Sequence, residues 1–271
     1  HKVVRRIKPS LSDAQKKRRI DFICDQVDET TGDYLGMGYV IHLDESWFFL
    51  LRDKEKVRMF PGEEIPGSPR VQHKSHLPKI MVIVANGRPD PSHDFDGKIG
   101  IWSICVMKTA EQSSKKRKRG EDGTRLVQLD GESPHTGKNN PEILHSAGMG
   151  RGWMIELVTQ PAQSPDLNVN GLGFFESLKS RVWGMNASSI DELVETIFDQ
   201  YEKYDGDTLE WVWYSLFKVY NQILRQLGNN DFSVEHTGVT ACQRAGTLER
   251  VIEYDREAFP TAWDYLASSP R

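Results

Sequence analysis

The sequence contains little cysteine and no long apolar segment. Its three cysteines, Cys24, Cys105 and Cys242, lie far apart in a chain of 271 residues. This number and spacing argue against a disulfide framework and against a cysteine-based zinc site, and they favour a reducing compartment. No apolar run approaches membrane-spanning length and no signal peptide is recognisable, so we expect no membrane partner.

The chain also lacks an excess of positive charge. Its 35 Lys and Arg residues are outnumbered by 39 Asp and Glu residues, and the formal net charge is -4. Any surface that binds nucleic acid would therefore have to be local. Basic residues cluster at 1–6, at 16–19 and most densely at 115–119. Composition leaves two interpretations of these runs open: solvated loops, or sites of nucleic-acid contact and nuclear import.

The length and the apolar content are sufficient for one large domain with a proper core. Hydrophobic residues make up 38% of the chain and charged residues 27%, as in ordinary globular proteins. The chain begins with His1 rather than Met, and its basic start resembles the interior of a longer sequence. We therefore expect an N-terminal part to precede it.

Strand patterns dominate the first half of the chain. The predicted strands are residues 39–43, 47–51, 57–60, 79–85, 99–106 and 126–129. The first three suggest a hairpin. The run 79–85 is continuously apolar, which predicts a central strand covered on both faces. Asp44 directly follows the first of these strands, and Asp130 follows the last.

Helical patterns dominate the second half. Apolar residues recur at helical spacing from near Asn170, and residues 189–192 and 207–210 have the composition of capping boxes. Gly228 predicts the end of the last strong helix. Strands followed by helices predict a single α/β domain, with a mixed central sheet flanked by helices and a helical C-terminal portion.

The two carboxylates at predicted strand ends, Asp44 and Asp130, are the candidate site residues. On adjacent strands, with a third carboxylate from a helix, they could hold two divalent cations about 3.5–4 Å apart. Oxygen ligands of this kind suit Mg²⁺ or Mn²⁺, and such a pair of ions catalyses phosphodiester chemistry. The simpler alternative is that Asp130 and the glycine after it only open a turn.

Three segments, considered together, resemble the catalytic blocks of mariner-like transposases. Residues 41–48 (IHLDESWF) are similar to the first block, residues 126–135 (LVQLDGESPH) to the second, and residues 164–175 (SPDLNVNGLGFF) to the third. Further segments resemble the branch found in plants and oomycetes: residues 7–9, 16–19, 95–102, 112–117 and 228–236. The resemblance covers roughly residues 5–240, and the order and number of the segments make it specific.

This resemblance implies an RNase H-like fold and a triad of aspartates that binds two Mg²⁺ or Mn²⁺ ions. It also implies nicking and strand transfer at the terminal inverted repeats of a transposon, with target DNA as the second DNA partner. The expected location is the nucleus, and the expected assembly is a homodimer. Asp44 matches the first aspartate of the triad and Asp130 the second. Gly171 occupies the third position, five residues after Asp166.

Glycine at the third position supplies no ligand, so we expect catalysis to be impaired. No neighbouring carboxylate is an obvious substitute. Asp166 belongs to the turn and is expected to cap or brace the helix. Glu176 is half a turn out of phase with Gly171, and Glu132 and His135 lie in a turn beside Asp130.

The resemblance divides the chain into three parts. Residues 1–36 are a linker or remnant of an N-terminal DNA-binding region, residues 37–230 the RNase H-like catalytic domain, and residues 231–271 a C-terminal tail with a candidate helix at 247–258. Two alternatives to an impaired transposase stay open. One is a non-catalytic DNA- or protein-binding relic, or domesticated transposase, and the other is an RNase H-like nuclease outside transposition.

Overall fold

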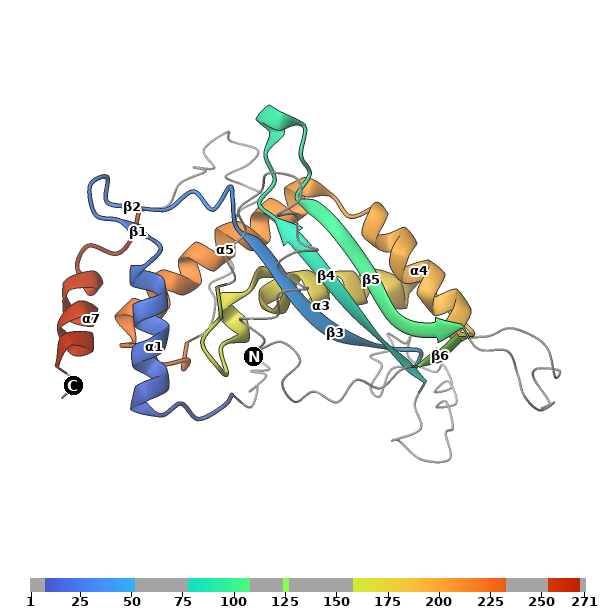
Figure 1. Cartoon of the computed structure of the whole chain (residues 1–271), viewed down its shortest axis with the longest axis horizontal. Coiled ribbons are helices and arrows are strands. Elements are labelled where there is room, and N and C mark those ends of the chain that lie inside the picture. Colours follow the sequence, from blue (N-terminus) through green and yellow to red (C-terminus); the bar gives the residue numbers. More distant parts are fainter. Residues whose placement is uncertain (1–7, 52–77, 108–123, 127–157, 233–252, 269–271) are drawn as a thin grey trace, which may run out of the picture.

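The computed structural model describes residues 8–51, 78–107, 124–126, 158–232 and 253–268 (Figure 1). Four strands form one antiparallel sheet in the order β3 (Ile41–Phe49), β4 (Lys79–Gly87), β5 (Lys98–Met107) and β6 (Thr124–Leu126). The predicted strand at 57–60 and the whole second block from residue 127 onward lie outside the described residues. Asp130, Glu132 and His135 are therefore not placed.

Strand β3 continues through Asp44, so the prediction that Asp44 ends a strand is wrong. The strand pairs with β4 in unbroken register from Ile41 opposite Gly87 to Phe49 opposite Lys79. The apolar β4 supplies hydrogen-bonding partners along the whole length of β3, so polar residues in the middle remain extended. The functional consequence is that Asp44 projects from within the sheet.

Strand β4 confirms the prediction of a central strand. It lies between β3 and β5. Ile80, Val82 and Val84 are fully buried on one face, and Met81 and Ala85 are also buried on the other. The continuous apolar run in the sequence arises from burial on both faces.

Helices cover one face of the sheet (Figure 1). In chain order they are the 3-10 turn η5 (Pro165–Leu167), the π-helix η6 (Asn170–Phe174), α3 (Phe175–Gly184), α4 (Ile190–Glu202) and α5 (Gly206–Arg225). The predicted helix start near Asn170 is confirmed, as is Ser189 as the N-cap of α4. Gly228 adopts φ +82° and donates its N–H to the Ile223 carbonyl at 2.8 Å, which confirms it as the end of α5.

The predicted capping box at 207–210 is wrong. The carboxylate of Asp205 accepts hydrogen bonds from the backbone N–H groups of Asp207 and Thr208, so α5 begins at Gly206. Glu210, the expected second half of the box, instead pairs with the buried Arg88 at 2.7 Å. The Glu210 carboxylate, which the local pattern assigned to the helix end, thus forms a tertiary ion pair with Arg88.

The first and last described helices lie together at one end of the molecule (Figure 1). This end comprises helix α1 (Asp13–Cys24), the short strands β1 (Val27–Asp28) and β2 (Asp33–Tyr34), and helix α7 (Ala258–Ala267). Ser12 caps α1, and the helix residues Ile20 and Ile23 are fully buried in the core cluster that includes α5. Helix α7 starts where the expected tail helix was to end, because residues 253–257 form a bridge and a turn. No described helix is long and apolar enough to cross a membrane.

Candidate functional site

Asp44 lies on the inner face of β3, the face that packs against the helices. Side chains alternate along a strand, so His42, Asp44, Ser46 and Phe48 share this face. His42 and Phe48 are buried and Asp44 is half-buried, while Leu43 is exposed on the other face. The Asp44 carboxylate accepts a hydrogen bond from the Glu45 N–H at 2.9 Å.

Gly171 lies directly beside Asp44. A Cβ atom built on Gly171 would lie 3.3 Å from Asp44 Oδ2. A carboxylate at position 171 could therefore bind the same metal ion as Asp44, although the two positions are 127 residues apart in the sequence. The structure brings together these two predicted positions, whereas Asp130 lies outside the described residues.

Gly171 is exposed to solvent, but the turn before it crowds the place that a Cβ atom would take. The same Cβ would lie only 2.8 Å from the carbonyl oxygen of Pro165 and 3.4 Å from its Cβ. A side chain at this position requires the turn η5 to move, because a contact below about 3 Å is repulsive. Glycine therefore fits the present packing, and it offers no side chain that could bind a metal ion.

Buried amides hold this segment against the sheet. Asn170 Nδ2 donates to the His42 carbonyl at 2.8 Å, and Asn86 Nδ2 donates to Asn170 Oδ1 at 2.7 Å. Asn168 Nδ2 donates to the Leu43 carbonyl at 3.1 Å. Asn86 and Asn170 are fully buried, so these bonds satisfy groups that would otherwise be costly to bury. These hydrogen bonds fix the position of Gly171 relative to Asp44.

His42 belongs to the same network. Its Nδ1 accepts a hydrogen bond from the Val169 N–H at 2.9 Å, which places the proton of the neutral ring on Nε2. Burial lowers the pKa of His42 to about 4. The ring packs against Trp213 with centroids 4.6 Å apart. These positioning residues were not predicted from the sequence, although the position of His42 two residues before Asp44 is a signal that both side chains project from one face of the strand.

Asp166 does not point into the site. Both of its oxygens accept from the Arg19 guanidinium at 2.7 Å, and Arg19 is fully buried. Asp166 was expected to cap or brace the helix that follows it, whereas it ties the turn η5 to α1, and η6 has no side-chain cap. The Asp166 carboxylate is therefore engaged away from Asp44.

Lys179 is a further residue near Asp44 that was not predicted from the sequence. It extends from α3 and donates from Nζ to Ser46 Oγ at 2.6 Å. Burial lowers the pKa of Lys179, and the charges of Glu176 and then Asp44 partly offset this shift. Glu176 is exposed at the start of α3, and its charge acts on Lys179.

The described residues fit a divalent metal only in part. Within the described ranges no three His, Cys, Asp or Glu residues are grouped to hold a metal ion. Asp44 supplies one carboxylate and Gly171 supplies none. Residues 124–126, which lead toward Asp130, pair with β5, so two strands separate them from β3. The expected adjacency of the two carboxylate strands is not found in this described part.

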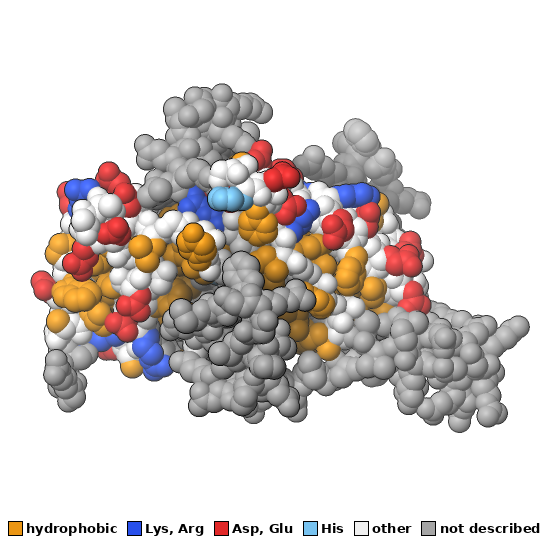
Figure 2. Space-filling model, turned by 45° about the horizontal axis from the view of Figure 1, so that its top comes forward, with side chains coloured by type: hydrophobic (Ala, Val, Ile, Leu, Met, Phe, Trp, Pro, Cys, Tyr) orange, Lys and Arg blue, Asp and Glu red, His pale blue; other side chains and the backbone are white. Residues whose placement is uncertain are grey.

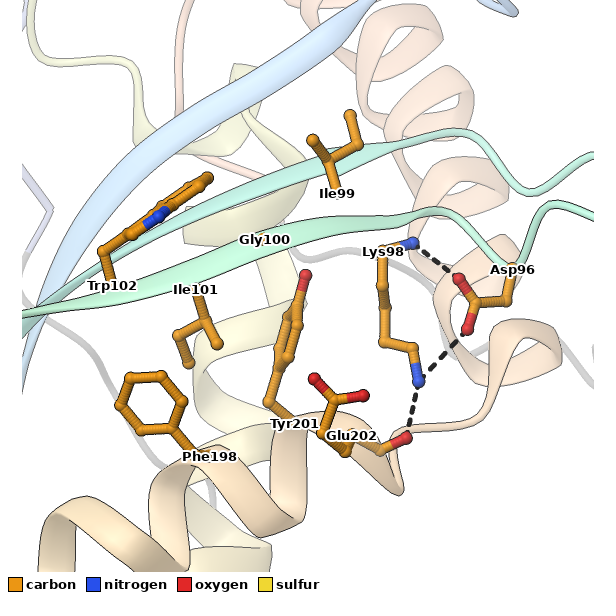
Figure 3. Close-up of a pocket in the computed structure, with 9 residues that line it drawn as sticks. All are labelled: Asp96, Lys98, Ile99, Gly100, Ile101, Trp102, Phe198, Tyr201 and Glu202. Atoms are coloured by element: carbon orange, nitrogen blue, oxygen red, sulfur yellow. Dashed lines mark hydrogen bonds and ion pairs between the residues drawn. The ribbon is translucent and has the colours of Figure 1, made fainter.

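A separate hollow of about 400 Å³ lies along β5 and α4 (Figure 3). Trp102 and Phe198 form its apolar side. Its charged end is closed by Lys98, which pairs with Asp96 at 3.1 Å and donates to the Glu202 carbonyl at 2.6 Å. The polar groups at this end bind one another, and neither Asp44 nor Gly171 lines the hollow. We therefore place the candidate site at Asp44.

Comparison with solved structures identifies the fold. The chain is similar to a pre-cleavage Mos1 transpososome, with a TM-score of 0.59 and 15% identity over 86% of this chain and 68% of that one. It is similar to Mos1 mariner paired-end complexes with Mn (TM-score 0.56, 17% identity, 86% and 68% covered) and with Mg (0.55, 17%, 84% and 67%). No protein-family model and no curated protein matches the sequence. The predicted fold class is confirmed: a mixed α/β, RNase H-like fold.

Proposed function

We propose that this chain is the catalytic domain of a mariner-type transposase, of the branch found in plants and oomycetes, with impaired cleavage. The observation that carries the proposal is the position of Gly171 beside Asp44, in a fold shared with Mos1 transposase complexes. The first and third catalytic blocks of the sequence meet at this point. The activity in question is phosphodiester cleavage and strand transfer at transposon ends.

In this proposal Asp44 and Asp130 hold Mg²⁺ or Mn²⁺. The Mos1 complexes with Mn and with Mg support this choice of ions. When bound, the ions would activate the attacking oxygen and neutralise charge at the phosphodiester. Asp44 anchors the ions from the rigid centre of β3, and the His42 and Asn170 network keeps helix η6 against it. The absent third carboxylate weakens the site.

The proposed partners are the terminal inverted repeats of a transposon and target DNA, bound by a homodimer in the nucleus. The surface in Figure 2 bears on this. On that face the described Lys and Arg side chains are scattered among Asp and Glu, around an apolar band. That face offers no concentrated basic patch among the described residues. The basic run 115–119 is the proposed element of phosphate contact.

A second candidate is a relic that binds DNA or protein without catalysis. The close approach of the Pro165 carbonyl to position 171 favours it, because a side chain there requires the turn η5 to move. The two candidates differ in one property. A catalytic remnant needs a divalent metal, and a pure binding module does not.

Nicking of a supercoiled plasmid that carries two transposon ends tests the proposal, with Mg²⁺ or Mn²⁺ as the variable. The natural chain, Gly171→Asp, and Gly171→Asp with Asp44→Asn or Asp130→Asn are compared. Glu45→Gln in the Gly171→Asp background is the matched control, because Glu45 neighbours Asp44 but projects from the opposite face of β3.

We expect an inert natural chain, metal-dependent nicking by Gly171→Asp, and loss of nicking with Asp44→Asn or Asp130→Asn but not with Glu45→Gln. Nicking by the natural chain would show that another group completes the site. Salt-dependent DNA binding with no nicking by any variant would favour the binding relic. The absence of both DNA binding and nicking would refute the transposase and the DNA-binding relic, and would leave only a relic that binds protein.

A further inference from the structure

Lys179 places a positive charge on the same strand face as Asp44. Its Nζ lies 2.6 Å from Ser46 Oγ, and Ser46 is two residues from Asp44, so both side chains project toward the helices. Lysine side chains on a helix point back toward its N-terminus. For Lys179 this direction leads along α3 toward η6 and Gly171.

The surroundings of Lys179 keep its ammonium group in place. Its Nζ lies 5.6 Å from the centre of the Phe48 ring and 5.9 Å from that of Phe175, both buried residues. These contacts and the Ser46 hydroxyl anchor the amine at the edge of the core. The carboxylates whose charges act on it are Glu176, on its own helix, and Asp44, on β3.

We infer that Lys179 is a resident cation that offsets the charge of Asp44 and thereby determines a low affinity of this site for divalent metal ions. The inference rests on the proposed function only in taking Asp44 as a metal ligand. It adds a second cause of impairment that is independent of Gly171, and it assigns a role to a residue outside the three catalytic blocks.

The physical reason is competition between cations for one carboxylate. A divalent ion at Asp44 is repelled by an ammonium group held on the neighbouring position of the strand face, and partial burial strengthens this repulsion. Without metal, the same ammonium group stabilises the ionised Asp44. Lys179 therefore favours the metal-free state of the site.

Mn²⁺ binding to the full chain without DNA tests this inference, measured by the electron paramagnetic resonance signal of free Mn²⁺. The titration is done in the natural and Gly171→Asp backgrounds. We expect Lys179→Gln to tighten Mn²⁺ binding by about tenfold. Lys179→Arg, which keeps the charge, and Lys218→Gln, which removes a lysine packed on Tyr214 of α5, should leave it unchanged.

Unfolding without metal provides a second measurement. If Lys179 offsets the charge of Asp44, Lys179→Gln should lower the melting temperature more in the natural chain than in the Asp44→Asn background. Mn²⁺ binding that is weakened by Asp44→Asn but not tightened by Lys179→Gln would overturn the role of Lys179 alone. Mn²⁺ binding that Asp44→Asn leaves unchanged would instead overturn the metal role of Asp44 in the proposed function, and this inference with it.

Discussion

At the scale of single residues, Gly171 has the largest consequences. In the proposed function its missing side chain removes a metal ligand, and the Pro165 carbonyl crowds the place of a Cβ atom. Restoring aspartate must therefore displace the turn η5 before it can assist a metal. An aspartate at position 171 would strengthen metal binding but weaken the packing of the turn η5.

We predict that Gly171→Asp lowers the free energy of unfolding by roughly 1–3 kcal/mol in the absence of metal, the usual cost of overpacking. Gly171→Ala should show a loss of similar size. Mn²⁺ should restore stability to the aspartate variant only, because only that variant gains a ligand. Urea unfolding with and without Mn²⁺ measures this. Gly184→Ala is the control, since a Cβ there meets nothing within 4 Å, and equal stability of all variants would contradict the prediction.

His42 makes stability depend on pH. Its pKa is about 4 in the folded protein and about 6.5 in an unfolded chain. Above pH 6.5 the ring is neutral in both states. Below pH 6.5 the unfolded state takes up a proton that the folded state refuses, so stability falls until about pH 4, by roughly 3 kcal/mol in all.

Urea unfolding from pH 7.5 to pH 4 tests this dependence, with His42→Gln as the comparison. We expect the variant to be less stable at pH 7.5, since it loses the bond to Val169. Its stability should change less between pH 6.5 and pH 4 than that of the natural chain. Parallel curves for the two proteins would exclude His42 as the cause.

At the scale of elements, the start of α5 shows where the local sequence pattern and the folded structure place the N-cap differently. The local pattern predicts a cap at Asp207, whereas the structure caps the helix with Asp205. We predict that Asp205→Ala costs about 1 kcal/mol of stability, the usual value for an N-cap, and that Asp207→Ala costs less. Thermal unfolding of the two variants compares the positions directly. A larger loss of stability in Asp207→Ala than in Asp205→Ala would show that Asp207 is the N-cap, as the local pattern predicts.

At the scale of the whole molecule, the ion pair of Arg19 with Asp166 joins the N-terminal helix to the site. It links residues 147 apart in sequence, and Arg19 is fully buried. Helix α1 therefore holds the turn η5, whose Pro165 carbonyl lies next to Gly171. Any displacement of α1 acts on the candidate site through this pair.

We predict that Asp166→Asn destabilises the protein by about 3–5 kcal/mol, because it leaves a buried guanidinium group without its counter-charge. Arg19→Ala should have a similar effect. Arg18→Ala, at the exposed neighbouring position of α1, is the matched control and should change stability little. Chemical denaturation measures the three, and hydrogen exchange should show α1 losing protection first. Equal stability of the Arg19 and Arg18 variants would refute this link.

Local patterns were sufficient for the fold class and for several elements. The apolar run of β4, the caps at Ser12 and Ser189 and the glycine after α5 all act within a few residues, so the sequence displays them directly. The order of the three segments that resemble catalytic blocks is also displayed by the sequence, and glycine at the third catalytic position stays a prediction. The proposed boundaries at residues 36 and 230 stay predictions.

Other features depend on contacts between distant segments. Strand β3 runs through Asp44 because β4 pairs with it, and Glu210 leaves its helix end because Arg88 is buried nearby. The approach of Gly171 to Asp44, the Pro165 carbonyl above it and the ammonium group of Lys179 all join parts of the chain that no local pattern relates. Periodicity and capping are local free energies that the sequence carries by itself. The geometry of the site depends on which buried polar groups find partners, and only the packed chain establishes that.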